Sequence, residues 1–258
     1  MLRPRIIPCL LVHGGGLVKT VAFKDPKYVG DPINAVKIFN EKETDELTVL
    51  DIDATVEGRG PNFKMIADLA VESRMPLCYG GGVKTAEQAK RIIELGVEKV
   101  SVSSAAMEDP DLISRIAGEI GRQSVVVTLD VRRGRSGYEV WTHNGKKATG
   151  RPVLDMCRRA EELGAGEVVI NSIDADGMMK GYDLDLARDV RQVLTIPMTF
   201  LGGAGKLSDL GRLIETCGVV GAAAGSLFVF KGPYRAVLIN YPDMAKREEL
   251  IRTSLKAA

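Results

Sequence analysis

The sequence predicts an α/β protein with the (β/α)8 barrel, or TIM barrel, architecture, and three observations favour it. Short runs rich in Val, Ile and Leu alternate eight times with helix-like stretches, which is the pattern of a parallel sheet covered by helices. The length of 258 residues suits one such barrel. The second half of the chain also repeats the first.

The repeat has a constant spacing. Pro76–Gly82 resembles Pro197–Gly203 and Arg91–Glu94 resembles Arg212–Glu215, with the same offset for both pairs (197 − 76 = 121 and 212 − 91 = 121). Such a repeat is typical of a closed fold with two similar halves.

We therefore expect a single barrel domain over 1–258, built from half-barrels of about 1–123 and 124–258. The alternative is a doubly wound open sheet. An open sheet would not naturally give two equal halves, and the GxGxxG signature of dinucleotide binding is absent from the sequence.

The eight predicted strands are almost continuously apolar, as strands buried on both faces should be. They are Arg5–His13, Glu46–Asp53, Pro76–Gly80, Lys99–Ser103, Ser124–Val131, Glu167–Ile173, Pro197–Leu201 and Val219–Ala224.

Capping residues mark the helices between these strands. Thr85 should begin a helix that Gly96 closes, Asp109 with Pro110 should cap one through about Ala117, and Asp183 should cap one toward Leu194. The stretch from Tyr138 to Lys147, with Trp141 and His143, should form a small hairpin without chemistry.

Composition excludes several classes of function. A net charge of +1 provides no long-range field for nucleic acid or an anionic membrane. The four cysteines are far apart in sequence, without a CxxC pair, and there are two histidines, so we expect buried, reduced thiols and no metal site. The N-terminus lacks the long apolar segment of a signal peptide or membrane helix, so we expect a cytoplasmic protein.

Glycine clusters follow the third and seventh strands, where a barrel places its catalytic mouth. One strand later in each half, small residues begin a helix, and free N–H groups and hydroxyls there can bind an anion. Tight turns are the alternative for either cluster alone. Together they predict two phosphate cradles on opposite sides of one mouth, formed by Gly81, Gly82, Ser103 and Ser104 and by Gly202, Gly203, Gly225 and Ser226.

Asp130 ends the fifth predicted strand at the expected mouth. A carboxylate leaving a buried strand is costly unless it is hydrogen-bonded or used, so acid or base catalysis is the favoured role and a cap is the alternative. Asp51, Asp176 and Gly177 follow comparable strands and are candidates for substrate binding.

Four charged residues, Arg5, Glu46, Lys99 and Glu167, stand at or near the starts of strands at the opposite end. Their charges sum to zero, which would allow a buried ring of alternating charge. Solvated charges at the strand starts are an equal alternative. His13–Gly16 and Lys19 suggest a glycine-rich loop after the first strand, either a mobile lid, a phosphate contact or a flexible surface loop.

Motifs spread over almost the whole chain resemble the cyclase subunit of imidazole glycerol phosphate synthase, a HisF-like family. They are Arg5–Leu10, Gly30–Pro32, Leu50–Ile52, Gly80–Gly82, Ser124–Val127, Ser172–Gly177, Gly181–Asp183 and Gly202–Lys206. The resemblance implies a duplicated half-barrel that binds a ligand with two phosphates, needs no cofactor, and docks a HisH-like glutaminase at its bottom. Ammonia would pass through the barrel, and Arg5, Glu46, Lys99 and Glu167 match the family's charged gate.

The chain departs from this family at one catalytic position. The family cyclises with two aspartates, of which Asp130 matches the second and Leu11 replaces the first. A leucine cannot transfer a proton, and one positioned acid or base contributes about 10² to 10⁴ in rate. The glycines after Leu11 also replace charged residues, although Lys19 is retained.

The pattern resembles divergent relatives in surface-polysaccharide (O-antigen, lipopolysaccharide) biosynthesis, where ammonia supplies an acetamidino group on a sugar through a separate sugar amidotransferase. We expect that role. An ordinary histidine-biosynthesis cyclase, and a non-catalytic scaffold that activates the glutaminase, are the alternatives.

Overall fold

The computed structural model describes residues 3–135 and 137–257 and confirms the predicted barrel. Eight parallel strands form a closed ring in which β1 pairs with β12 as well as β4. In ring order they are β1 (Arg5–His13), β4 (Leu47–Asp51), β5 (Leu77–Gly80), β6 (Lys99–Val102), β7 (Val125–Gly134), β10 (Glu167–Ser172), β11 (Met198–Leu201) and β12 (Gly221–Ala224).

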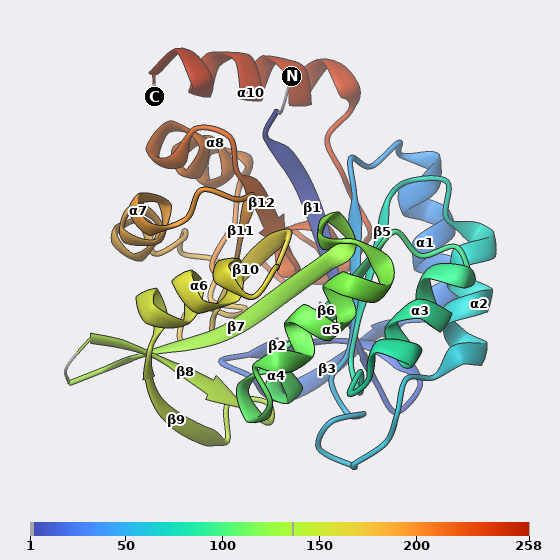
Figure 1. Ribbon diagram of the computed structural model, residues 1–258. Helices are drawn as coiled ribbons and strands as arrows, with labels where there is room; N and C mark the ends of the chain where they lie inside the picture. Colours follow the sequence, from blue (N-terminus) through green and yellow to red (C-terminus); the bar gives the residue numbers. More distant parts are fainter. Residues whose placement is uncertain (1–2, 136, 258) are drawn as a thin grey trace.

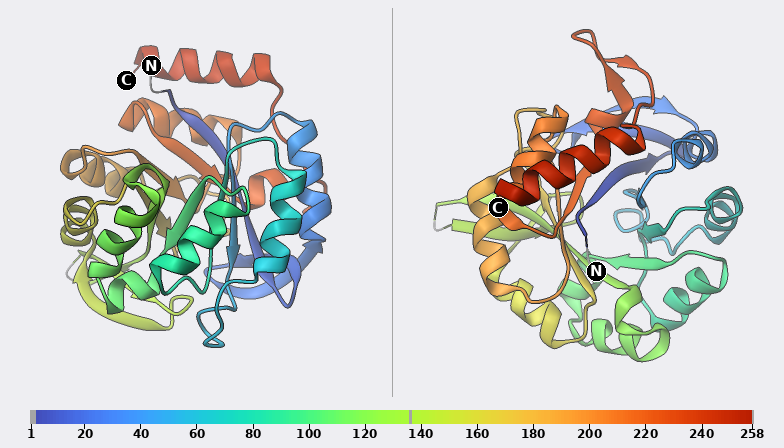
Figure 2. Two further views of the ribbon diagram at one scale, coloured as in Figure 1. Left: turned by 45° about the vertical axis from the view of Figure 1, so that its right-hand side comes forward. Right: turned by 90° about the horizontal axis from the view of Figure 1, so that it is seen from above.

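Helices surround this ring, as the view from above in Figure 2 shows. They are α1 (Pro32–Glu41), α2 (Phe63–Glu72), α3 (Ala86–Glu94), α5 (Asp111–Ile120), α6 (Val153–Glu162), α7 (Leu184–Val193), α8 (Leu207–Cys217) and α10 (Met244–Ala257). Their inner faces and the outer faces of the strands form one continuous apolar core, because each strand is covered on both sides.

The predicted helix ends are confirmed in two cases and corrected in one. Thr85 accepts a hydrogen bond from the Gln88 backbone in a full capping box, and Asp183 accepts one from the Leu186 backbone. The side chain of Asp109 does not cap α5 and pairs with Arg115 instead.

Short elements begin at the mouth, where the strands end. α4 (Ser104–Glu108) follows β6 and α9 (Ser226–Val229) follows β12. These short helices place the predicted small-residue segments beside the carboxyl ends of the strands.

Three hairpins extend the barrel. β2 (Gly16–Val21) and β3 (Lys24–Gly30) continue from β1, and β8 (Gly137–Thr142) and β9 (Lys147–Pro152) continue from β7 (Figure 1). The hairpin predicted around Tyr138 to Lys147 is therefore confirmed. β13 (Phe230–Lys231) pairs with β14 (Ala236–Val237) after α9.

The segment expected to be a loop after the first strand is a pair of strands, β2 and β3. Gly14 and Gly15 form a tight turn with positive φ between β1 and β2, and Leu17 and Val18 are buried. Lys19 consequently lies within an ordered strand and not on a loop.

Candidate active site

The mouth of the barrel encloses a cavity of about 1210 Å³, including the volume open to solvent. This is large enough for a nucleotide-sized ligand. The structure brings all of the mouth residues singled out in the sequence to its wall: Leu11, Lys19, Asp51, Gly81, Gly82, Ser103, Ser104, Asp130, Asp176, Gly177, Gly202, Gly203, Gly225 and Ser226.

Each glycine cluster is held close to neighbouring backbone. Gly81 and Gly203 have φ of +124° and +108°, and a Cβ at Gly203 would overlap the carbonyl oxygen of Gly181. Only glycine allows the chain to approach so closely with this backbone conformation. The glycines are therefore required for close packing of the mouth loops against neighbouring backbone.

The two serine hydroxyls of the first predicted cradle, Ser103 and Ser104, have different surroundings. Ser104 accepts a hydrogen bond from the backbone N–H of His143 at 3.2 Å, so the β8–β9 turn holds this side chain. The Ser103 hydroxyl is buried without a partner among the described residues. An unpaired buried hydroxyl is costly, and an anion at this cradle would satisfy it.

Lys19 lies at the second cradle. Its ammonium donates to the carbonyl oxygen of Cys9, and a Cβ at Gly225 would lie 2.7 Å from Nζ. Burial lowers the pKa of Lys19, an effect that the nearby Asp176 opposes. A phosphate at Gly225 would supply the counter-charge that this buried ammonium lacks.

Asp130 forms one wall of the cavity, together with Asn171 of the adjacent strand. The Asn171 amide donates to Asp130 Oδ1 at 2.9 Å. Burial raises the pKa of Asp130 to about 7, although the Asn171 hydrogen bond acts in the opposite direction. A carboxyl group that titrates near neutral pH can both give and take a proton.

The corresponding place in the first half is apolar. Leu11 is the strand partner of Leu50, just as Asp130 is the partner of Asn171, and Leu50 and Asn171 are themselves related by the repeat (171 − 50 = 121). Leu11 and Leu50 pack against an apolar cluster in the barrel that includes Leu201. We call Leu11, Leu50 and Leu201 the apolar wall.

Two other carboxylates are held by internal hydrogen bonds. Asp51 accepts from the backbone N–H groups of Asp53 and Ala54 at 3.0 and 3.1 Å. Asp176 accepts from the Thr20 hydroxyl at 2.6 Å, and burial raises its pKa. Both side chains border the cavity, and these hydrogen bonds hold the loops of the mouth in place.

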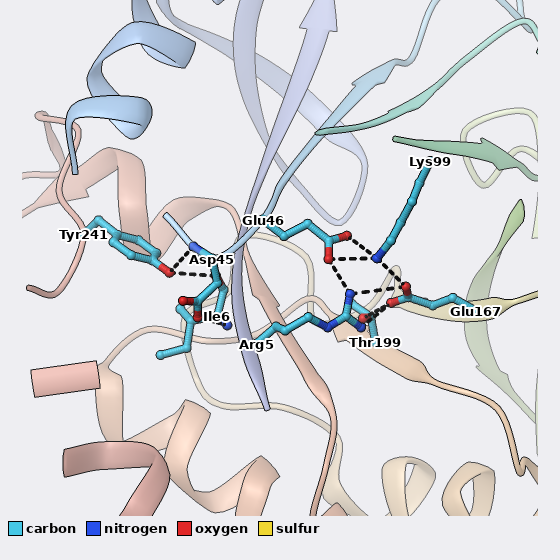
Figure 3. A network of polar contacts seen from close by, with 8 residues as sticks. All are labelled: Arg5, Ile6, Asp45, Glu46, Lys99, Glu167, Thr199 and Tyr241. Atoms are coloured by element: carbon cyan, nitrogen blue, oxygen red, sulfur yellow. Dashed lines mark hydrogen bonds and ion pairs between the residues drawn. The ribbon is translucent and has the colours of Figure 1, made fainter. Parts of the chain in front are cut away.

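At the opposite end of the barrel, four charged side chains converge (Figure 3). Lys99 Nζ lies 2.8 Å from Glu46 and 2.9 Å from Glu167, and Arg5 pairs with both carboxylates. We call Arg5, Glu46, Lys99 and Glu167 the charged ring. The alternative of separate solvated charges is wrong, because both glutamates are buried.

The charged ring is electrostatically stabilised. Burial would raise the pKa of Glu167, but Arg5, Lys99 and a hydrogen bond from Thr199 together lower it to about 2. The same carboxylates raise the pKa of Arg5 and Lys99 despite their burial. Arg5, Lys99 and Glu167 are therefore charged near neutral pH.

The structure adds a support for this ring that sequence reasoning missed. Asp45, next to Glu46, accepts from the Ile6 backbone at 2.9 Å and from Arg247 at 2.7 Å, and Tyr241 donates to the Ile6 carbonyl (Figure 3). No local signal could reveal this set, because its members are about 200 residues apart in sequence.

Other cavity residues were also missed. Asn171 and Thr128 interrupt apolar strands, and a polar residue in a buried strand is a signal that could have found them. Asn144 reaches the cavity from the β8–β9 turn and donates to the Ile52 carbonyl at 2.7 Å. Its position depends on a hairpin that folds back across the mouth, and no local signal marks it.

Within residues 3–135 and 137–257 there is no cluster of His, Cys, Asp or Glu suited to a metal ion. All four cysteines are free and buried, as the sequence predicts. No helix in the described part of the chain is both long and apolar enough to cross a bilayer.

Comparisons with known proteins agree with this architecture. Residues 5–234 match the family described as "Histidine biosynthesis protein". A Leptospira interrogans protein, provisionally named imidazole glycerol phosphate synthase subunit HisF, is 56% identical over 97% of this chain and 99% of its own length.

Two further relatives extend the comparison. A Pseudomonas aeruginosa protein, also provisionally named, as subunit hisF2, is 53% identical over 95% of this chain and 98% of its own length. Imidazole glycerol phosphate synthase subunit HisF of Dehalococcoides mccartyi is 41% identical over 88% of this chain and 90% of its own length. Taken with the barrel, its mouth and its charged ring, these similarities show that the chain belongs to the HisF-like imidazole glycerol phosphate synthase subunits of the histidine biosynthesis protein family.

Proposed function

We propose that this chain is a HisF-type subunit that receives ammonia from a partner glutaminase and passes it to an acetamidino-forming reaction on a sugar of surface polysaccharide. The observation that carries this proposal is the apolar wall at the mouth. Leu11 and Leu50 face the cavity where the second half has Asp130 and Asn171. Of these two equivalent places, only the one in the second half has a side chain that can transfer a proton, Asp130.

The apolar wall disfavours the cyclisation that two opposed carboxylates would catalyse. One positioned acid or base contributes about 10² to 10⁴ in rate. Neither Leu11 nor its neighbour Leu50 can replace it, and Asp51 is already engaged by two backbone N–H groups. No other carboxylate in the described cavity wall is placed beside Leu11.

The interior supports passage of a small neutral molecule. Between the charged ring and the mouth, the apolar cluster of Ile7, Cys9, Leu201 and Ala223 lines this part of the barrel interior and contacts Leu11. Ammonia crosses such surfaces more readily than the ammonium ion, because burying an unpaired charge is costly. A HisH-like glutaminase docked at the charged ring would release it by hydrolysing the glutamine side-chain amide.

At the acceptor, the ammonia nitrogen would attack the carbon of a sugar-linked acetamido group. A separate sugar amidotransferase would first convert that carbonyl oxygen into a phosphate or nucleotidyl ester at the expense of a nucleoside triphosphate. The C–N bond then forms as the C–O bond breaks, the esterified oxygen leaves as phosphate or nucleoside monophosphate, and the product keeps both nitrogens as an amidinium group. The two cradles and Lys19 would bind a phosphorylated small molecule at the mouth. This ligand could report that an acceptor is present.

A test follows from Leu11. With ammonium salts and the two-phosphate ribonucleotide that the cyclases use, the chain should turn over at about 10⁻² of the Leu11→Asp variant or less, since one carboxylate is restored. Leu11→Asn has nearly the same shape and no acid, and it should stay inactive. If the unsubstituted chain turns over this substrate as fast as an active Leu11→Asp variant, the chain is a cyclase and the proposal is wrong.

An active histidine-biosynthesis cyclase is the second candidate, because Asp130 keeps a pKa of about 7 at the mouth and both glycine cradles persist. A scaffold that only activates the glutaminase is the third. Asp130→Asn tests the scaffold against chemistry at this mouth: unchanged product formation in the full pathway favours a scaffold, and a collapse favours chemistry at this mouth.

A further inference from the structure

A hairpin at the mouth distinguishes the second half of the barrel from the first. In the first half α4 ends at Glu108 and α5 begins at Asp111. In the second half α9 ends at Val229, but α10 begins only at Met244. The extra residues form β13 and β14 and a return segment to α10, and they project beyond the barrel wall in the view from above (Figure 2).

This hairpin is firmly attached at its base. The Leu238 and Asn240 backbone N–H groups donate to the carbonyls of Val229 and Phe228 at 2.8 and 2.9 Å. Near its tip, Arg235 donates to the Gly177 carbonyl at 2.9 Å. A projecting segment held at both ends presents a defined surface.

The surface is aromatic and apolar, and it is exposed. Tyr234 at the tip is 94% exposed, and Val237 and Leu238 are half-exposed. The β2–β3 hairpin lies alongside, since Lys27 Nζ lies 5.2 Å from the centre of the Phe230 ring. We call Tyr234, Val237 and Leu238 the rim patch.

Positive charge surrounds the rim patch. The two hairpins and the return segment, residues 16–30 and 230–243, contain two acidic residues, Asp25 and Asp243, and Asp243 is paired with Lys246 of α10. Lys24 and Lys231 are exposed, and Lys27 and Arg235 both lie against the Phe230 ring. Two copies of this chain meeting patch to patch would oppose like charges, so the patch favours an acidic partner over itself.

The rim patch also adjoins the cavity. Arg235 contacts Gly177, and Thr20 and Phe23 of the neighbouring hairpin border the same cavity. A protein seated on the patch would cover the opening through which ammonia leaves.

We infer that the rim patch docks the enzyme that consumes the ammonia, a sugar amidotransferase with an acidic face around an apolar recess. This inference rests on the proposed function. The barrel would then be the middle of three proteins, with the glutaminase at the charged ring and the amidotransferase at the mouth. Docking at the mouth keeps ammonia out of water between the two reactions, where it would be protonated and diluted.

The test compares a Lys231→Glu/Tyr234→Ala variant with the unsubstituted chain, in an assembly with a HisH-like glutaminase and a sugar amidotransferase from the same organism. Transfer of ¹⁵N from the glutamine amide to the sugar should fall about tenfold or more, because exposed aromatic and cationic anchors dominate protein interfaces. Binding of the amidotransferase to the barrel should weaken in parallel. Glutamine hydrolysis and sugar amidation driven by ammonium salts should stay unchanged.

The matched control is Arg158→Glu/Val71→Ala, which makes the same change of charge and also truncates an exposed apolar side chain, on α6 and α2, and should leave transfer intact. Unchanged ¹⁵N transfer in the rim variant overturns the inference. The inference is also overturned if the rim variant binds the amidotransferase normally but no longer binds phosphatidylserine-containing vesicles. That result would make the rim patch a membrane contact. If the unsubstituted chain transfers no nitrogen to the sugar, the proposed function fails, which is a separate result.

Discussion

Asp130 shows how strongly one position depends on its neighbours. Leu11, its counterpart in the repeat, occupies the equivalent place in the ring of strands. Leu11 pairs with Leu50 on the adjacent strand, whereas Asp130 pairs with Asn171. The Asn171 amide makes a buried carboxylate tolerable without removing its cost. An aspartate at position 11 would have no such donor from Leu50.

The raised pKa of Asp130 predicts an effect on stability. Its carboxyl titrates at about 7 when folded, against 3.8 as its ordinary value. Between these values the folded state binds more protons than the unfolded state, so ionisation of Asp130 reduces the free energy of unfolding as the pH rises. Asp130→Asn should remove this penalty and stabilise the protein above about pH 7, by on the order of 2 to 4 kcal/mol, and not near pH 4.

Urea unfolding at the two pH values measures this difference. Asp185→Asn, at a side chain 89% exposed, is the control and should show no comparable change. A pH-independent effect of Asp130→Asn would mean that the carboxyl is ionised in the folded protein throughout this range.

At the scale of elements, the charged ring depends on where four strands begin. Arg5, Lys99 and Glu167 start β1, β6 and β10, and Glu46 precedes β4. Because parallel strands begin at the same end of a barrel, residues far apart in sequence meet there. A buried ring of this kind gives little stability over apolar residues, which supports the proposed role of these residues in controlling the entry of ammonia.

Lys99→Ala should therefore uncouple the two ends of the protein. Removing one partner of a buried charged cluster costs several kcal/mol, and nitrogen transfer from glutamine should fall roughly tenfold or more. Use of added ammonium salts should change little, because ammonia then reaches the mouth from solvent. The ratio of nitrogen transferred to glutamine hydrolysed gives the measurement, with Lys90→Ala on the surface of α3 as control. An unchanged ratio would remove the ring from the ammonia path.

At the scale of the whole molecule, the two ends of the chain are tied together beside the charged ring. Asp45 joins the start of β4 to Arg247 of α10 and to the backbone of Ile6 in β1. Arg247 is 3% exposed, and among the described residues its ion pair is with Asp45. The last helix therefore closes the barrel through a buried charge as well as through apolar contact.

Asp45→Asn should destabilise the protein by about 3 kcal/mol or more, because it leaves Arg247 buried without its opposite charge. Thermal and urea unfolding would both detect this loss. Asp68→Asn, which removes a surface ion pair with Lys64, should change stability by at most about 1 kcal/mol. Equal effects of the two substitutions would show that the buried pair adds nothing.

Much of this protein was determined by its sequence alone. The alternation of apolar runs with capped helices, and the offset of 121 between its halves (197 − 76 = 121), predicted the barrel, its mouth and the positions of the cradles. These are local or periodic properties, and burial of every strand on both faces makes them visible in the chain itself. The replacement of an expected acid by Leu11 was visible for the same reason.

Only the tertiary structure decided how distant residues meet. It turned the predicted loop after β1 into a hairpin that buries Lys19, and it placed Asn144 at the cavity and Asp45 against Arg247. It also showed that Leu11, which replaces the expected acid, lies with Leu50 and Leu201 in the apolar wall. These arrangements depend on pairings between strands and helices far apart in sequence, whose geometry no local pattern encodes, because it is set by the closure of the barrel.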